Sequence, residues 1–192
     1  MSIFRKKPLA KLLAQAADHS GLKRTLTAQG LVALGIGGSE ERGPAQWFTD
    51  VFAFAKRSGL RLTAHAGESM GPESVWAASE LGAERIGHGI ASVRDPGLMR
   101  HLRECDIPLE ICITSNLVTG VVKRIEDHPV RRLYDAGVPI VLNTDDPAMF
   151  RCTLVGEYQL AAREFGFSEP ELRGIAANAF RYAFGGRRGA GG

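Results

Sequence analysis

Short apolar runs alternate with longer amphipathic segments along most of the chain. Five short runs are rich in apolar residues, and we interpret them as near-continuous apolar runs rather than clean alternations of apolar and polar positions. Uninterrupted runs of this kind are typical of parallel strands that are covered on both faces. The predicted strands lie at 31–36, 60–65, 85–89, 108–113 and 139–144.

Segments with apolar residues at helical spacing follow the runs. After the first run, Trp47, Val51, Phe52 and Ala55 share one helical face. We predict helices near 44–58, 73–81, 96–104, 128–136, 154–165 and 169–182, with another at 8–17 before the first strand. The glycine- and arginine-rich residues 185–192 are predicted to be disordered.

Repeated βα units imply either a doubly wound sheet or a (β/α)8 barrel. The polar residues gather at the carboxyl ends of the runs, where a barrel collects its active site from many strands. A complete barrel needs about 250 residues, and only five units are visible. The predicted fold class is therefore α/β of the (β/α)8 TIM-barrel type, in a partial form. The predicted organisation is an N-terminal helical segment at 1–30, a barrel portion at 31–184 and the tail at 185–192.

Composition narrows the possible partners and the compartment. The net charge of +3 is small and the basic residues are spread out, so we predict no nucleic-acid partner. No apolar run approaches the roughly 18 residues that would span a membrane, so we predict no membrane partner. The three cysteines form no CxxC pair, and the N-terminus lacks the apolar stretch of a signal peptide. A cytoplasmic location is expected.

His65 ends the second predicted strand, and Glu68 follows it across Gly67. A neutral imidazole at a strand end can bind zinc. The glycine allows a sharp turn, which would bring the carboxylate near the same metal for proton transfer. An isolated His-x-x-Glu segment in a loop is also common in surface hydrogen bonding.

His88 ends the third predicted strand between two glycines. It is a candidate to polarise a water or hydroxide, and it could equally cap the next turn by hydrogen bonding. Asp145 and Asp146 follow the fifth strand. Adjacent carboxylates repel each other, so a divalent metal on one and a substrate or water proton on the other would stabilise them. The alternative is a helix N-terminus, with an Asp as N-cap and Pro147 at the first helical position.

The order and spacing of these segments are more informative than any one of them. Successive strand ends are 27, 23, 27 and 30 residues apart, counted over Gly38, His65, His88, Ser115 and Asp145. These intervals are close to the roughly 30 residues per unit of an eight-unit barrel. The turn at Gly38 would let backbone approach a flat ligand, while Ser115 and Asn116 could bind a polar ligand or simply cap a turn.

Taken together, these segments resemble the adenosine deaminase family of metal-dependent hydrolases. The family's motifs are matched in order at 63–68 (TAHAGE), 85–89 (RIGHG), 109–116 (LEICITSN) and 142–147 (LNTDDP). The resemblance covers about residues 31–184. It implies a (β/α)8 barrel with Zn2+ at its carboxyl-terminal mouth. It also implies hydrolytic deamination of adenosine or a related purine nucleoside, with release of ammonia.

The resemblance implies a role for four residues in the reaction. Glu68 is similar to the acid that protonates the purine ring nitrogen. His88 resembles the histidine that orients the zinc-bound hydroxide, and Asp146 resembles the neighbouring Asp that does the same and contacts the ring. Gly38 resembles the glycine whose backbone contacts the purine.

The resemblance implies that His65 and Asp145 are zinc ligands, but the rest of that ligand set is missing. The family's first barrel strand carries a His-x-His pair, and this sequence contains no His-x-His. Catalytic zinc sites usually have three protein ligands, so we expect these 192 residues alone to bind zinc weakly. We also expect self-association or a missing N-terminal barrel segment, because an open sheet exposes unpaired edges. A smaller departure is Ile113, where many relatives have proline.

Two further interpretations stay open. The chain could be a non-catalytic remnant, or a purine-nucleoside-binding module that keeps the pocket without the chemistry. Within the deaminases, the substrate could be adenine or aminodeoxyfutalosine instead of adenosine. The segment 35–44 (GIGGSEERGP) favours the bacterial deaminases of nucleoside-like substrates.

Overall fold

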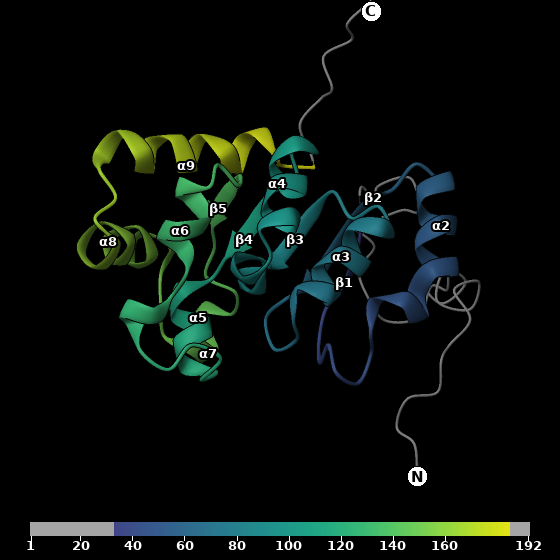
Figure 1. The fold of residues 1–192 in the computed structure, drawn as a ribbon, viewed down its shortest axis with the longest axis horizontal. Coiled ribbons are helices and arrows are strands. Elements are labelled where there is room, and N and C mark those ends of the chain that lie inside the picture. Colours follow the sequence, from purple (N-terminus) through teal and green to yellow (C-terminus); the bar gives the residue numbers. More distant parts are fainter. Residues whose placement is uncertain (1–32, 185–192) are drawn as a thin grey trace, which may run out of the picture.

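Five parallel strands form one sheet in the computed structural model, which describes residues 33–184 (Figure 1). The strands are β1 (Ala33–Ile36), β2 (Arg61–Ala66), β3 (Arg85–His88), β4 (Leu109–Ile111) and β5 (Ile140–Leu142). They lie side by side in sequence order, and each pairs in parallel with its sequence neighbour. A doubly wound sheet reverses its order at a switch point, so this uninterrupted order supports the barrel prediction.

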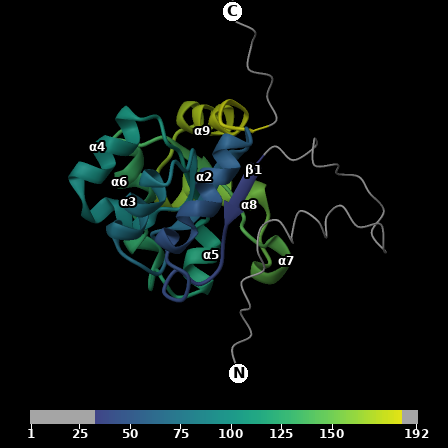
Figure 2. The same ribbon diagram turned by 90° about the vertical axis from the view of Figure 1, so that its right-hand side faces the viewer.

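Helices connect the strands, as expected for βα units. The longer ones are α2 (Thr49–Arg57), α3 (Pro72–Glu80), α4 (Pro96–Glu104), α6 (Val130–Asp135), α8 (Leu154–Phe165) and α9 (Glu169–Arg181). Shorter ones are α5 (Ile113–Val118), α7 (Pro147–Phe150) and the 3-10 turns η2 (Ala45–Phe48), η3 (Ile90–Arg94) and η4 (Ile125–Asp127). Figure 2 shows α3, α4 and α6 along one side, with α9 crossing above. None of the described helices is long and apolar enough to cross a membrane.

Strand β2 shows how the sheet separates a core face from a site face. Leu62, Ala64 and Ala66 are buried, whereas His65 is exposed and Thr63 is half-buried. Successive side chains of a strand point to opposite faces, so the apolar residues pack in the main hydrophobic core under the helices. His65 therefore points to the other face, the inner face of a barrel wall.

The main difference from the predicted elements lies after β4. The strand ends at Ile111, and α5 begins at Ile113 inside the predicted strand. The backbone N–H of Asn116 donates to the carbonyl of Cys112 at 3.0 Å, which closes a helical turn there. Ser115 and Asn116 are thus on a helix and not in an extended segment. The helix predicted at 8–17 and the boundaries at 1–30 and 185–192 lie outside the described residues.

Candidate active site

Four of the predicted site residues meet at the carboxyl ends of β2, β3 and β5. The rings of His65 and His88 lie 5.2 Å apart between centroids. His88 Nε2 is 3.5 Å from Glu68 Oε2. Asp145 lies close enough to raise the pKa of Glu68 by charge repulsion. The convergence joins residues that are up to 80 positions apart in sequence, as expected for the active face of a barrel.

His65 is held in a single tautomer by the backbone of the neighbouring strand. Its Nδ1 lies 3.2 Å from the carbonyl oxygen of Ile36. A carbonyl only accepts hydrogen bonds, so Nδ1 donates, and in the neutral ring Nε2 keeps its lone pair. Glycines make room for the ring, because a Cβ at Gly37 or Gly87 would lie 3.3 or 3.2 Å from it. A histidine tied to a carbonyl in this way is typical of a metal ligand.

Glu68 is half-buried, and its environment favours the protonated acid. Burial is the largest cause of its raised pKa, followed by repulsion from Asp145 and Glu40. The charged form of a carboxyl loses hydration when it is buried, and nearby negative charges disfavour it further. Glu68 is therefore suited to hold a proton and give it up, more than an exposed glutamate is.

His88 and Asp145 both adopt left-handed backbone conformations, with φ of 61° and 58°. Such a conformation costs a residue other than glycine about 1–2 kcal/mol, and strained backbone of this kind clusters at functional sites. Burial is the largest cause that lowers the pKa of His88 to about 4, followed by the nearby His65. His88 is accordingly neutral at neutral pH.

Two predicted residues lie on the same rim but make other contacts. The exposed carboxylate of Asp146 accepts from the backbone N–H groups of Ala148 at 3.0 Å and Met149 at 2.9 Å. It thus acts as N-cap of α7, the alternative that the sequence left open. Gly38 follows β1 with φ of 108°, a conformation that suits glycine. Within the described residues, neither one is hydrogen-bonded to the four converging side chains.

Glu40 is a site residue that sequence reasoning did not single out. It is buried, and its carboxylate accepts from the backbone N–H groups of Gly67 (2.7 Å), Glu68 (2.8 Å) and Ser69 (3.0 Å). The hydroxyl of Ser74 donates a fourth hydrogen bond to it at 2.7 Å. Glu40 thereby ties the turn after β1 to the turn that carries Glu68. In the sequence it is indistinguishable from any acidic residue after a glycine turn.

Asn116, His128 and Glu157 are three buried polar residues behind the same site. Asn116 contacts both Glu68 and His88, and His128 contacts Asn116. Glu157, from α8, accepts hydrogen bonds from the backbone N–H and the hydroxyl of Thr114. From the sequence, Asn116 is predicted only to bind a polar ligand or to cap a turn, and no role is predicted for His128.

As a metal centre, the described residues offer two suitable donors. His65 presents a free Nε2, and Asp145 has one oxygen oriented by the hydroxyl of Ser115, which donates at 2.8 Å. Ligands held by such outer hydrogen bonds are typical of metal sites. Within residues 33–184, no group of three or more His, Cys, Asp or Glu side chains could hold a metal. The pair fits part of a zinc site.

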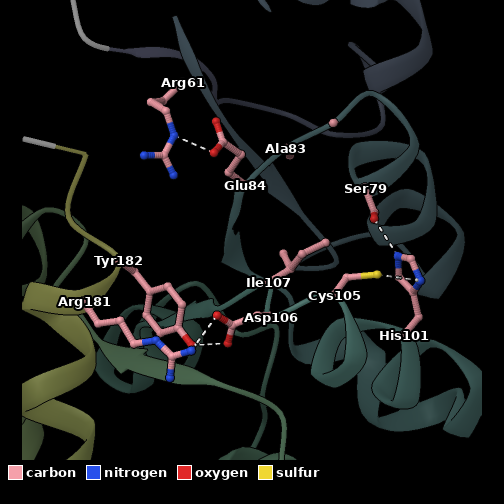
Figure 3. Close-up of a pocket in the computed structure, with 11 residues that line it drawn as sticks. Arg61, Ser79, Ala83, Glu84, His101, Cys105, Asp106, Ile107, Arg181 and Tyr182 are labelled. Atoms are coloured by element: carbon pink, nitrogen blue, oxygen red, sulfur yellow. Dashed lines mark hydrogen bonds and ion pairs between the residues drawn. The ribbon is translucent and has the colours of Figure 1, made fainter. Parts of the chain in front are cut away.

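A pocket of about 500 Å³ lies at the opposite ends of the strands (Figure 3). Its polar side chains are paired with one another. His101 Nε2 is 2.8 Å from Ser79 Oγ, its Nδ1 is 3.6 Å from Cys105 Sγ, and Tyr182 donates to Asp106 at 2.6 Å. Barrel enzymes use the carboxyl-terminal face, so this hollow is not the candidate site.

The sequence profile of a family described as adenosine deaminase matches residues 6–188. The aminodeoxyfutalosine deaminase of Streptomyces avermitilis is 46% identical over 160 residues, which are 83% of this chain and 45% of that protein. The adenosine deaminase of Serratia proteamaculans is 44% identical over 178 residues, 92% of this chain and 54% of that protein. The chain spans about half the length of the curated relatives it matches.

Several solved structures share the fold of this chain. The adenine deaminase from Arthrobacter aurescens superposes with a TM-score of 0.78 at 30% identity, covering 81% of this chain and 48% of that one. The N6-mAMP deaminase of arabidopsis gives 0.73 at 34% identity, covering 82% and 47%. These likenesses confirm the predicted α/β TIM-barrel class, of which this chain covers only a part.

Proposed function

This chain belongs to the adenosine deaminase family, and we propose that its site takes part in hydrolytic removal of the 6-amino group of a purine nucleoside. The observation that carries the proposal is the convergence of two histidines and two carboxylates on one face. The rings of His65 and His88 are in contact, Glu68 lies beside His88, and Asp145 is near enough to influence the pKa of Glu68 and of His88. Relatives that match most of this chain are named as deaminases of adenosine and aminodeoxyfutalosine.

Glu68 is the proposed proton donor to the purine ring. Protonating a ring nitrogen makes the adjacent carbon more electrophilic, and a positioned acid typically contributes about 10²–10⁴-fold. Its raised pKa keeps the carboxyl protonated at higher pH than usual. His88, neutral and 3.5 Å from Glu68, is proposed to orient the attacking water. Asp146 is proposed to assist it and to contact the ring, and the backbone of Gly38 is proposed to contact the purine.

We propose that His65 and Asp145 hold Zn2+. When bound, zinc lowers the pKa of a water molecule to about 7 and so supplies a nucleophile at neutral pH. Two ligands are fewer than the three of catalytic zinc sites, so the remaining donors must come from outside residues 33–184. The family resemblance points to a His-x-His strand, supplied by a further barrel segment.

The second candidate is a purine-nucleoside-binding module without turnover. The observation that favours it is the number of candidate metal ligands. The described residues supply two, and catalytic zinc sites usually have three protein ligands. Binding of adenosine that persists after chelation, with no ammonia released even when the missing strands are supplied, would support this candidate over the deaminase.

The test mixes the chain with the amino-terminal half of the Serratia proteamaculans adenosine deaminase and measures ammonia. Adenosine, aminodeoxyfutalosine, adenine and N6-methyl-AMP are the substrates to compare. We expect release from at least one of them, and a loss of about 10²–10⁴-fold in Glu68→Gln. Glu80→Gln, an exposed change on α3, is the matched control and should keep the activity. Equal activity in both variants would overturn the role of Glu68.

A further inference from the structure

We propose that His128 acts through Asn116 to fix the tautomer of His88, so that His88 presents an N–H group at Nε2 toward the reaction space. His128 and Asn116 are then positioning residues, because neither touches the reacting atoms. Only the catalytic consequence rests on the proposed deaminase function. The hydrogen-bond chain itself is a property of residues 88–130.

The chain of hydrogen bonds begins at a backbone group that can only donate. The N–H of Val130 donates to His128 Nδ1 at 3.2 Å, so this ring nitrogen must accept. His128 is 4% exposed, and burial lowers its pKa to about 4. A neutral imidazole that accepts at Nδ1 carries its single proton at Nε2. His128 therefore presents an N–H group toward Asn116.

The next link orients the amide of Asn116. His128 Nε2 lies 3.2 Å from Asn116 Oδ1 and donates to it, because an amide oxygen only accepts. Asn116 is fully buried, so solvent cannot supply hydrogen bonds to its amide in the flipped orientation. Its Nδ2 then lies on the opposite side, 3.2 Å from His88 Nδ1 and 3.5 Å from Glu68 Oε1. Both of these atoms can accept from an NH2 group.

The last link sets the proton on His88. Since Nδ1 accepts from Asn116, the proton of the neutral ring is at Nε2, 3.5 Å from Glu68 Oε2. In this form His88 can donate to a lone pair of a water molecule or of Glu68, but it has no free nitrogen with which to take a proton. The relay thus assigns His88 an orienting role and leaves the proton transfer to Glu68.

Helix α8 supports the relay from behind. The ring of Phe165, at the end of α8, packs against the ring of His128 with centroids 5.8 Å apart. Glu157, also on α8, holds Thr114 at the start of α5, two residues before Asn116. Both relay residues are therefore fixed by the same helix, which itself follows β5 and the Asp145 turn. This packing holds the relay residues in place, while the Val130 N–H group sets the direction of the relay.

The experiment reads the tautomers directly, by long-range proton–nitrogen NMR correlations of the histidine rings in the 15N-labelled 192-residue chain. In the native chain we expect His88 and His128 both to carry the proton at Nε2. Asn116→Asp replaces the donating amide by a carboxylate, which only accepts. We expect this change to move the His88 proton to Nδ1 while His128 stays as it was. His101→Gln is the control, because His101 bonds Ser79 on the far side and should leave both rings unchanged.

His88 protonated at Nδ1 in the native chain, or a His88 tautomer that Asn116→Asp does not alter, would overturn the relay. His128→Phe is a second variant and should leave His88 in a mixture of both forms. If either variant fails to fold, the native spectrum still decides between the two tautomers. In the complemented deaminase, Asn116→Asp should lower kcat about tenfold or more with a smaller change in KM. Absence of any deaminase activity would count against the proposed function without altering the NMR result.

Discussion

Glu40 accepts four hydrogen bonds with one buried carboxylate, and three of the donors are backbone groups of the turn that holds Glu68. The N–H of Gly67 has a second acceptor in the hydroxyl of Ser74, also at 2.7 Å. A buried donor that loses its partner costs about 1–3 kcal/mol, and more where the partner is charged. The position of Glu68 therefore depends on a side chain from the preceding βα unit.

Replacing this carboxylate should be costly. In Glu40→Gln an NH2 group faces at least one backbone N–H whichever way the amide turns, so we expect the free energy of unfolding to fall by about 2–3 kcal/mol. Ser74→Ala removes the hydroxyl that bonds Glu40, the carbonyl of Gly71 and the N–H of Gly67, but it leaves the three bonds from backbone N–H groups to Glu40, and it should cost about 1 kcal/mol. Urea unfolding of both variants measures the difference. Equal losses would mean that the backbone bonds contribute little.

The sequence predicts the site residues at the strand ends, but it does not predict the residues that hold those site residues in position. His65, His88 and Asp145 are predictable because each ends or follows an apolar run, which is a local signal. Glu40 and His128 have no such signal, because their partners lie on other units. Glu40 bonds a turn 27 to 29 residues away, and His128 bonds Asn116 12 residues away. Those contacts exist only after the units have packed.

At the scale of the element, the turn after β2 depends on a glycine in a crowded position. Gly67 has a φ of 68°, and a Cβ there would lie 2.4 Å from Cγ2 of the fully buried Val75. Gly166, which ends α8, has a similar φ of 65° but no atom within 4 Å of its Cβ position. The two glycines share the backbone requirement and differ only in crowding.

Alanine substitutions at Gly67 and Gly166 separate the cost of backbone strain from the cost of a steric clash. Gly166→Ala should cost about 1 kcal/mol, the penalty of a left-handed alanine. Gly67→Ala adds overpacking of about 1–3 kcal/mol, because Val75 cannot move away in a closely packed core. We therefore expect a total of about 2–4 kcal/mol from chemical denaturation. A Gly67 variant no less stable than the Gly166 variant would show that the turn relaxes freely.

The helices α4 and α8 lie where their periodicity predicts them, at 96–104 and 154–165. Each has a strong N-terminal signal, since Asp95 and Thr153 cap the first turns with their side chains. The predicted strand end at residue 113 is wrong, because 108–113 is apolar except at Glu110 and both a strand and a buried helical turn satisfy that pattern. Glu157, 43 residues from Thr114, helps to fix the helical choice. A local pattern has no access to that contact.

At the scale of the molecule, the described sheet ends at β1 on one side and β5 on the other. A closed barrel has no edges, whereas open parallel strands leave unpaired N–H and C=O groups that favour association. The inner face holds charge as well, since Arg85 and Glu110 form an ion pair at 2.5 Å on that face. The strand order was predictable from the βα repeat, but the closure of the sheet was not.

We expect the 192-residue chain alone to self-associate and to bind zinc weakly, because within residues 33–184 the metal site has only two ligands and the sheet has an unpaired edge on each side. Adding the amino-terminal half of a relative should yield one tight zinc per complex and a discrete sedimenting species, since both deficits are met by the same strands. His65→Ala and Asp145→Ala should each abolish the tight zinc, while His101→Ala, on the far side of the sheet, should retain it. Analytical ultracentrifugation with metal analysis of the same fractions measures both effects. A stable monomer of the chain alone with stoichiometric tight zinc would contradict this coupling, because it would require a complete metal site without further strands.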